Sequence, residues 1–181
     1  AEYSYDNASI NRIVASAGIA KGSFYQYFED KKDLFFYILD QIAAEKMKFL
    51  APTWQNLGEK DLFTSLRELT IAAIRFANEH PLYSEIGNWL VANKSSAIFN
   101  EIMVDNTDNL NEFFGVLLEK AIARGEIRDD IDTQMLSQVI ASMYLSAVDY
   151  PTKLAGKEFD ESMLASVDTF LEVLKNGIGR T

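Results

Sequence analysis

The side chains best suited to recognition chemistry lie close together near the N-terminus. Lys21 can donate hydrogen bonds to guanine O6 and N7 or to a phosphate, and Gln26 can bond adenine N6 and N7 together. Ser23 has a short hydroxyl that suits either a base or a phosphate. Gly22 lets the backbone come close to a partner surface. These residue types predict contacts to the edges of bases.

Three further residues in this stretch suit the phosphate backbone. Tyr25 and Tyr27 can place their hydroxyls on phosphates. Lys31 stands at the start of the next expected helix, where an ammonium and the helix N-terminal amides are directed at one anion. Phosphate contacts supply salt-dependent affinity, and base contacts supply specificity. We therefore predict double-stranded DNA as a partner.

Two short helices around a glycine are expected to position these groups. Apolar residues recur with helical spacing over residues 9–17, Gly18 can end that helix in a left-handed conformation, and a second helix is expected over 21–28. Such a hairpin is a helix-turn-helix, although a packed corner of a helical protein would show the same spacing. Five side chains are expected to lock its helices together, namely Ile13, Val14, Ile19, Phe24 and Phe28.

The order and spacing of residues 1–34 resemble the N-terminal signature of the tetracycline-repressor (TetR) family. The resemblance implies an all-α protein that binds a palindromic DNA operator as a homodimer. By position, it implies phosphate contacts for Tyr25, Tyr27 and Lys31 and a backbone contact for Ser9; Lys21, Gly22, Ser23 and Gln26 face the groove. It rests on Tyr5-Asp6, Ser9-Ile10, Ile13-Val14, Ala17-Gly18-Ile19, Lys21-Gly22-Ser23-Phe24-Tyr25, Tyr27-Phe28, Lys31 and Leu34.

The chain departs from that signature at two places. Ala20 stands where the family often has a serine, so a cap or phosphate contact is expected to be lost. The family also has a full helix before the motif, of which residues 1–4 resemble only the last turn.

Composition excludes several kinds of site. The chain has no cysteine, which rules out disulfides, thiolate zinc sites and thiol nucleophiles. Its single histidine, His80, precedes Pro81 in an expected turn and excludes any multi-histidine metal site. No Glu-x-x-His pair and no phosphate-binding glycine-rich loop is present. We therefore expect no enzyme, no cofactor and no metal.

Acidic charge is concentrated away from the candidate DNA contacts. The net charge is −10; residues 1–50 hold six Lys or Arg against seven Asp or Glu, net −1, and residues 51–181 hold 11 against 20, net −9. A DNA-binding module joined to an acidic body fits this distribution.

The rest of the chain is predicted to be helical. No alternating strand pattern appears, and no apolar run reaches about 20 residues, so we expect a cytoplasmic protein without a membrane span. The fold class is all-α, with a helix-turn-helix domain at 1–48 and a helical-bundle ligand-binding and dimerisation domain at 49–181. Helices are expected over 31–50, 59–78, 82–93, 95–105, 106–124, 133–150 and 159–175.

The last two helices are predicted to form the dimer interface. Their apolar residues step by three and four along the chain, as in a coiled-coil seam, although these faces would also suit packing within one subunit. The predicted interface comprises Leu136, Ile140, Met143, Leu164, Val167, Leu171 and Leu174.

The middle of the chain is rich in aromatic and flexible apolar residues, which suit an apolar pocket for a small-molecule effector. Trp89 and Tyr144 are the first candidates because each joins an apolar body to one polar group. The other candidates are Phe63, Met103, Phe114 and Met143, and for each of these residues ordinary core packing is an alternative.

Together these features predict a bacterial transcription regulator, a repressor that an effector of unknown identity releases from its operator. The alternative is a helical lipid- or partner-binding protein with a vestigial DNA module.

Overall fold

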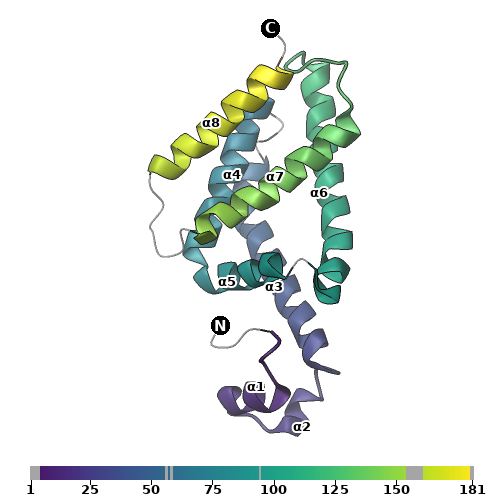
Figure 1. Cartoon of the computed structure of the whole chain (residues 1–181), viewed down its shortest axis with the longest axis vertical. Helices are drawn as coiled ribbons and strands as arrows, with labels where there is room; N and C mark the ends of the chain where they lie inside the picture. Colours follow the sequence, from purple (N-terminus) through teal and green to yellow (C-terminus); the bar gives the residue numbers. More distant parts are fainter. Residues whose placement is uncertain (1–4, 56, 58, 94, 154–160, 180–181) are drawn as a thin grey trace. The chain divides into compact units, whose positions relative to one another are not determined.

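The protein is described by a computed structural model that covers residues 5–55, 57, 59–93, 95–153 and 161–179. Side chains are described except at 91, 103–108, 144–153, 161–163 and 166. The described helices are α1 (Ile10–Ala17), α2 (Lys21–Phe24), α3 (Lys31–Gln55), α4 (Leu62–Glu79), α5 (Pro81–Ala92), α6 (Ala97–Ala123), α7 (Thr133–Lys153) and α8 (Glu161–Ile178). The all-α prediction is confirmed, and Figure 1 shows the order of these helices along the chain.

The chain divides into two compact units, Ala1–Phe49 and Leu50–Thr181. The sequence placed this boundary between residues 48 and 49. Helix α3 is continuous across it.

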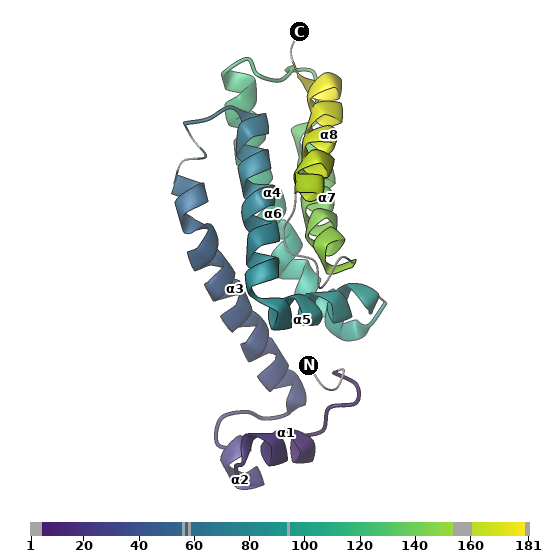
Figure 2. The ribbon, with the colours of Figure 1, turned by 90° about the vertical axis from the view of Figure 1, so that its left-hand side faces the viewer.

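Unit 1 is built from α1, α2 and the first part of α3; α1 and α2 pack against each other, and Figure 2 shows them at the N-terminal end of α3. Its buried side chains are Val14, Phe24 and Phe35, one from each helix. The rings of Phe24 and Phe28 lie 5.5 Å apart. Ile19, which was expected in this core, is 46% exposed because it follows the left-handed residue that ends α1. The helix-turn-helix therefore closes around a small aromatic core.

Two helix ends differ from the prediction. Helix α2 ends at Phe24, four residues before the expected position, and Tyr25 to Tyr27 form a turn. Helix α3 runs through Pro52 to Gln55, although a break was expected there. A proline removes one backbone donor, and in α3 this loss falls in the last turn, where little helix remains to be disrupted.

Unit 2 is a bundle whose core lies among α4, α6, α7 and α8. Helix α4 supplies Leu62, Leu66 and Leu69, spaced so that they share one face. They pack in a cluster with Phe114 and Leu118 of α6, Leu136 and Ile140 of α7, and Val167 and Leu171 of α8. The expected helices at 95–105 and 106–124 are one helix, α6, because no glycine or proline separates them.

The turn after α6 is fastened to the end of α8. Gly125 follows the end of α6 and adopts φ 71°, and Ile127 is fully buried beside it. The Arg128 amide donates to the Ile178 carbonyl at 3.1 Å, next to a bridge between Ile127 and Gly179. These bonds join the turn after α6 to the C-terminal end of α8. No helix in the described part of the chain is both long and apolar enough to span a membrane.

Candidate nucleic-acid interface

Local capping positions the helices of unit 1. The Ser9 hydroxyl accepts a hydrogen bond from the Arg12 amide at 3.3 Å and caps α1, and Gly18 ends that helix with φ 66°. Ala20 precedes α2 without a side-chain cap, as the departure from the family signature predicted. Asp30 accepts from the Asp33 amide at 2.9 Å at the start of α3. Gly18 at the end of α1 and Asp30 at the start of α3 therefore cap the two helices on either side of the segment that carries the candidate DNA contacts.

The predicted base and phosphate contacts form one exposed stretch in unit 1. Lys21, Gln26 and Tyr27 are exposed, with Tyr27 exposed to 78%, and Tyr25 is exposed to 52%. Ser23 is half-buried. Because α2 is short, Gln26 and Tyr27 belong to the turn that follows it. The structure thus brings these donors together, with Lys21 and Ser23 on the helix itself.

Gly22 is not required by the fold. A Cβ atom built on it meets nothing within 4 Å, and its φ lies outside the left-handed region. Gly18, in contrast, has the positive φ that disfavours any side chain. A glycine without a structural reason, on the exposed side of α2, is consistent with close approach of a partner.

Lys31 is bound within the subunit. It is half-buried, and its ammonium donates to the Tyr5 carbonyl at 2.8 Å and lies 4.2 Å from the centre of the Tyr5 ring. Two predicted DNA contacts therefore make side-chain hydrogen bonds within unit 1: Ser9 accepts from the Arg12 amide, and Lys31 donates to the Tyr5 carbonyl. The bond to Tyr5 could not be predicted from the sequence, because it joins residues 26 positions apart.

The predicted effector contacts are not all brought together. Phe114 is 1% exposed in the unit 2 core, and Phe63 packs at the start of α4, with the Lys175 ammonium 5.6 Å from its ring. Trp89 lies on α5, which follows the other end of α4. At 1.5 Å per residue, α4 separates these two ends by roughly 25 Å. Phe63 therefore lies at the opposite end of α4 from the start of α5, and a common site for Phe63 and Trp89 stays a prediction. The side chains of Met103 and Tyr144 lie outside the described residues.

Three buried polar atoms in unit 2 have no hydrogen-bond partner within the described part of the chain: Trp54 Nε1, Asn78 Nδ2 and Asn111 Oδ1. Each such atom costs about 1–3 kcal/mol unless a ligand or water satisfies it. An unsatisfied amide is visible only once the packing around it is known.

The predicted dimer seam lies mainly inside one subunit. Leu136, Ile140, Val167 and Leu171 are at most 9% exposed and belong to the unit 2 core, and Leu174 packs against that core. Leu164 is half-buried. The buried residues pack within the subunit, because α4 lies against both α7, which carries Leu136 and Ile140, and α8, which carries Val167 and Leu171.

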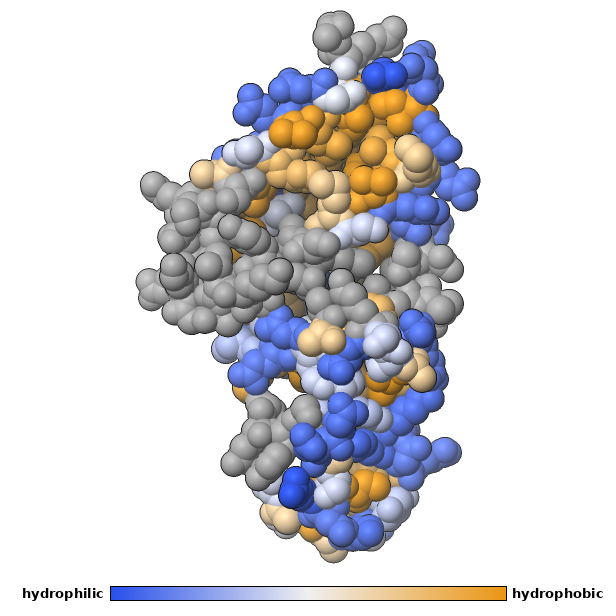
Figure 3. All heavy atoms as spheres, in the orientation of Figure 1, coloured by the Kyte–Doolittle hydropathy of each residue, from blue (hydrophilic) through white to orange (hydrophobic). Residues whose placement is uncertain are grey.

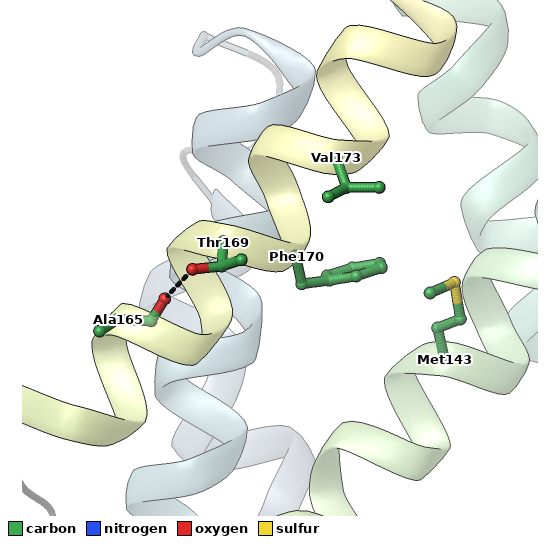
Figure 4. A pocket seen from close by; sticks show the side chains of 5 residues that line it. All are labelled: Met143, Ala165, Thr169, Phe170 and Val173. Atoms are coloured by element: carbon green, nitrogen blue, oxygen red, sulfur yellow. Dashed lines mark hydrogen bonds between the residues drawn. The ribbon is translucent and has the colours of Figure 1, made fainter.

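A different apolar face of α7 and α8 is exposed. Met135, Val139 and Val173 are 59%, 43% and 68% exposed. Met143 and Phe170 line an open groove of about 500 Å³ with Ala165, Thr169 and Val173. In Figure 4 the side chains of Phe170 and Val173 on α8 point toward Met143 on α7. Figure 3 shows apolar atoms gathered over this part of α7 and α8. Of the predicted interface residues, Met143 lies on this face.

Comparison with known proteins places the exposed stretch of unit 1 in a family context. The model described as "Bacterial regulatory proteins, tetR family" matches residues 1–38, which hold α1, α2 and the start of α3. The fatty acid metabolism regulator protein of Bacillus subtilis is 28% identical over 187 residues, covering 98% of this chain and 89% of the relative.

Solved structures match nearly the whole chain. A TetR family transcriptional regulator from Chloroflexus aurantiacus has a TM-score of 0.72 at 25% identity, covering 99% of this chain and 88% of the other. The regulator FadR from Bacillus subtilis, solved with stearoyl-CoA, has a TM-score of 0.69 at 19% identity, covering 96% and 90%. The second of these likenesses concerns the fold.

Proposed function

The chain belongs to the TetR family of bacterial regulatory proteins, and on this premise we propose that it is a transcriptional repressor released from its operator by an effector with a long acyl chain. It is a DNA-binding, ligand-responsive transcription regulator, as its similarity to members of that family indicates. The observation that carries the proposal is the exposed stretch of donors on α2 and the turn after it.

In the proposed complex, α2 lies in the major groove. Lys21, Ser23 and Gln26 contact base edges there, and Gly22 allows the backbone to approach. The hydroxyls of Tyr25 and Tyr27 donate to phosphates on either side. Ser9, which already caps α1, directs the start of that helix at the backbone.

The effector class follows from the relatives and from the chemistry of unit 2. One relative is named for fatty acid metabolism, and one fold neighbour was solved with stearoyl-CoA. The buried Asn78 and Asn111 atoms supply a donor and an acceptor within an apolar bundle, which suits a long chain with one polar end. We propose Trp89 among the contacts to the chain, since it joins an apolar body to one N–H donor.

The ion pairs of unit 2 are relevant to the chemistry of the effector's polar end. Lys60 is paired with Glu68, Arg67 with Asp168, Arg124 with Glu126 and Arg128 with Asp130. These pairs leave few described cations for the phosphates of a coenzyme A thioester. Comparing the thioester with the free acid therefore tests which acyl compound is the effector.

A homodimer is the proposed active form, formed through the exposed apolar face of α7 and α8. A two-fold dimer places two copies of α2 in successive major grooves, as a palindromic operator requires. The face consists of Met135, Val139, Met143, Ala165, Thr169, Phe170 and Val173.

Release would follow from coupling through α3, which is continuous from unit 1 into unit 2. An effector that binds one arrangement of the dimer more tightly lowers DNA affinity by the same factor by which DNA lowers effector affinity. A saturating effector that leaves DNA affinity unchanged would remove this part of the proposal.

The DNA assignment is tested by mobility-shift titration on the DNA upstream of the protein's own gene. Tyr27→Phe removes one exposed hydroxyl and is expected to weaken binding several-fold, about the effect of one hydrogen bond. Tyr37→Phe is the matched control, because Tyr37 of α3 is also exposed (51%) but its ring packs on Phe28. Equal binding by both variants and wild type would refute the phosphate contact, and no shift on any DNA would refute the function.

The effector is tested by adding stearoyl-CoA, stearate or coenzyme A alone to the preformed complex. Release by an acyl compound but not by coenzyme A supports the proposed class, and the comparison of thioester with free acid identifies the form. Failure of every acyl compound to release a specific complex would refute the effector class and leave the DNA function standing.

A further inference from the structure

The bond between Lys31 and Tyr5 gives Lys31 a role that differs from the phosphate contact implied by the family resemblance. The ammonium of Lys31, the first residue of α3, donates to the Tyr5 carbonyl at 2.8 Å. The same carbonyl accepts the amide of Ala8 at 3.3 Å. One acceptor therefore closes the turn of residues 5–8 and joins it to α3.

The Tyr5 ring is held by the same helix. The Lys31 ammonium lies 4.2 Å from its centre, within the range of a cation–π interaction. The ring of Phe35 lies 4.8 Å away, and Phe35 is buried. Lys31 and Phe35 are four residues apart on α3 and so lie on one face of it. Both the backbone and the side chain of Tyr5 are thus fixed by two successive turns of α3.

Residues 5–8 lead directly into the first helix of the DNA-binding motif. A second bond, from Arg12 Nη1 to the Asn7 carbonyl at 3.1 Å, ties the segment to α1. Ser9, the cap of α1, follows immediately. The start of α1 is therefore joined to α3 through a segment that the Lys31 bond and the contact of the Tyr5 ring with Phe35 hold in place.

The exposure of the neighbouring donors supports the distinction. Lys21, Tyr25 and Tyr27 are exposed, whereas Lys31 is half-buried, with a donor directed into the protein. We propose that Lys31 is a positioning residue for DNA binding: it holds residues 5–8, and with them the start of α1, on α3, instead of contacting a phosphate. This inference rests on the proposed DNA-binding function.

The test compares Lys31→Met with Lys32→Met in the full-length protein. Both variants remove one charge from the first turn of α3, but Lys32 is exposed and its ammonium lies 5.5 Å from the Phe36 ring, away from Tyr5. Two readouts are measured: amide hydrogen exchange of residues 5–9 without DNA, and the dependence of operator affinity on salt.

For Lys31→Met we expect faster exchange of residues 5–9 and operator affinity lowered about tenfold, the effect of losing one charge-assisted hydrogen bond. The slope of log affinity against log salt is expected to stay at the wild-type value, because no phosphate contact is lost. Lys32→Met is expected to leave the exchange unchanged. A slope reduced by about one in Lys31→Met, or unchanged exchange of residues 5–9, would overturn the proposal.

A second variant keeps the test decisive if Lys31→Met unfolds unit 1. Tyr5→Leu keeps every charge and removes the ring between Lys31 and Phe35. It is expected to speed exchange of residues 5–9 and to lower affinity without changing the salt slope, and wild-type exchange would count against the proposal. Because exchange is measured without DNA, its outcome is independent of whether the operator assignment is correct.

Discussion

Replacing Val173 with aspartate tests where two copies of the chain meet. Val173 is 68% exposed on α8 and lies beside Phe170 in the groove shared with α7. Burying a valine side chain completely is worth about 1.5–3 kcal/mol, so the exposed two-thirds offers about 1–2 kcal/mol on association. A two-fold interface counts each residue twice.

The expected loss is therefore about 2–4 kcal/mol per dimer, which raises the dimer dissociation constant about 30- to 1000-fold. Desolvation of the new carboxylate adds to the loss. Sedimentation velocity over a dilution series measures the constant directly, and far-ultraviolet circular dichroism checks that the subunit remains folded.

Two variants serve as controls. Leu82→Asp introduces the same charge at an apolar residue that is 60% exposed at the start of α5 and does not belong to the proposed interface, and it is expected to leave the dimer intact. Leu171→Ala, at a residue only 6% exposed, is expected to lower the free energy of unfolding by about 2–5 kcal/mol as a core truncation. A dimer dissociation constant equal to wild type for Val173→Asp would show that copies associate through another surface.

Further predictions concern single residues. Gly22→Ala is expected to leave stability equal to wild type or raise it by about 0.5–1 kcal/mol, because its Cβ meets only open space in the free protein. The same Cβ is expected to obstruct the approach of the α2 backbone to DNA and so to weaken operator binding in a mobility-shift titration. Gly18→Ala is expected to destabilise the protein in urea by about 1–2 kcal/mol, since φ is 66° there, and a stability equal to wild type would contradict this. Burial alone would raise the pKa of Asp61, but hydrogen bonds from Thr64 and from the Phe63 amide outweigh it and lower that pKa. The carboxylate of Asp61 therefore stabilises α4 above its unfolded-state pKa and loses this effect as the pH falls through its lowered folded-state pKa. Asp61→Ala is thus expected to cost about 1 kcal/mol in urea melts at neutral pH and less in acid. Asn111→Leu removes an unsatisfied buried oxygen and is expected to raise the melting temperature while abolishing release from DNA by the effector, and a fully responsive variant would place the effector elsewhere.

The helices of unit 1 were predictable because their signals are local. Ser9 and Gly18 cap and end α1 where the spacing of apolar residues begins and stops, and neither depends on distant packing. The end of α2 was predicted four residues too late, because Phe28 continues the apolar pattern after the helical backbone has stopped. Periodicity records which side chains face the core, and a turn can satisfy it as well as a helix.

The proposed dimer face was not predictable from spacing alone, because α8 carries two apolar faces. Val167 and Leu171 repeat like a coiled-coil seam, but α4 is also apolar and covers them within the subunit. Val173 lies on the other face and is exposed, and the half-buried Phe170 lines the groove beside it. The sequence indicates that a helix face is apolar, whereas only the tertiary structure shows which helix covers that face. The unsatisfied atom of Asn78 was hidden for the same reason.

We expect the short α2 to make dimerisation a condition of DNA recognition. Of the proposed groove-facing residues, Lys21, Gly22 and Ser23 lie on the helix itself, so one copy is expected to have few direct contacts to bases. Each good base contact discriminates by about 1–3 kcal/mol, so a single copy separates operator from other DNA weakly, and two linked copies add their contributions. Val173→Asp leaves every proposed DNA contact in place. It is therefore expected to lose operator binding at protein concentrations below its raised dimer dissociation constant and to regain binding above that concentration. Binding that follows the same concentration dependence as wild type would show that one copy suffices, and would require base contacts beyond α2.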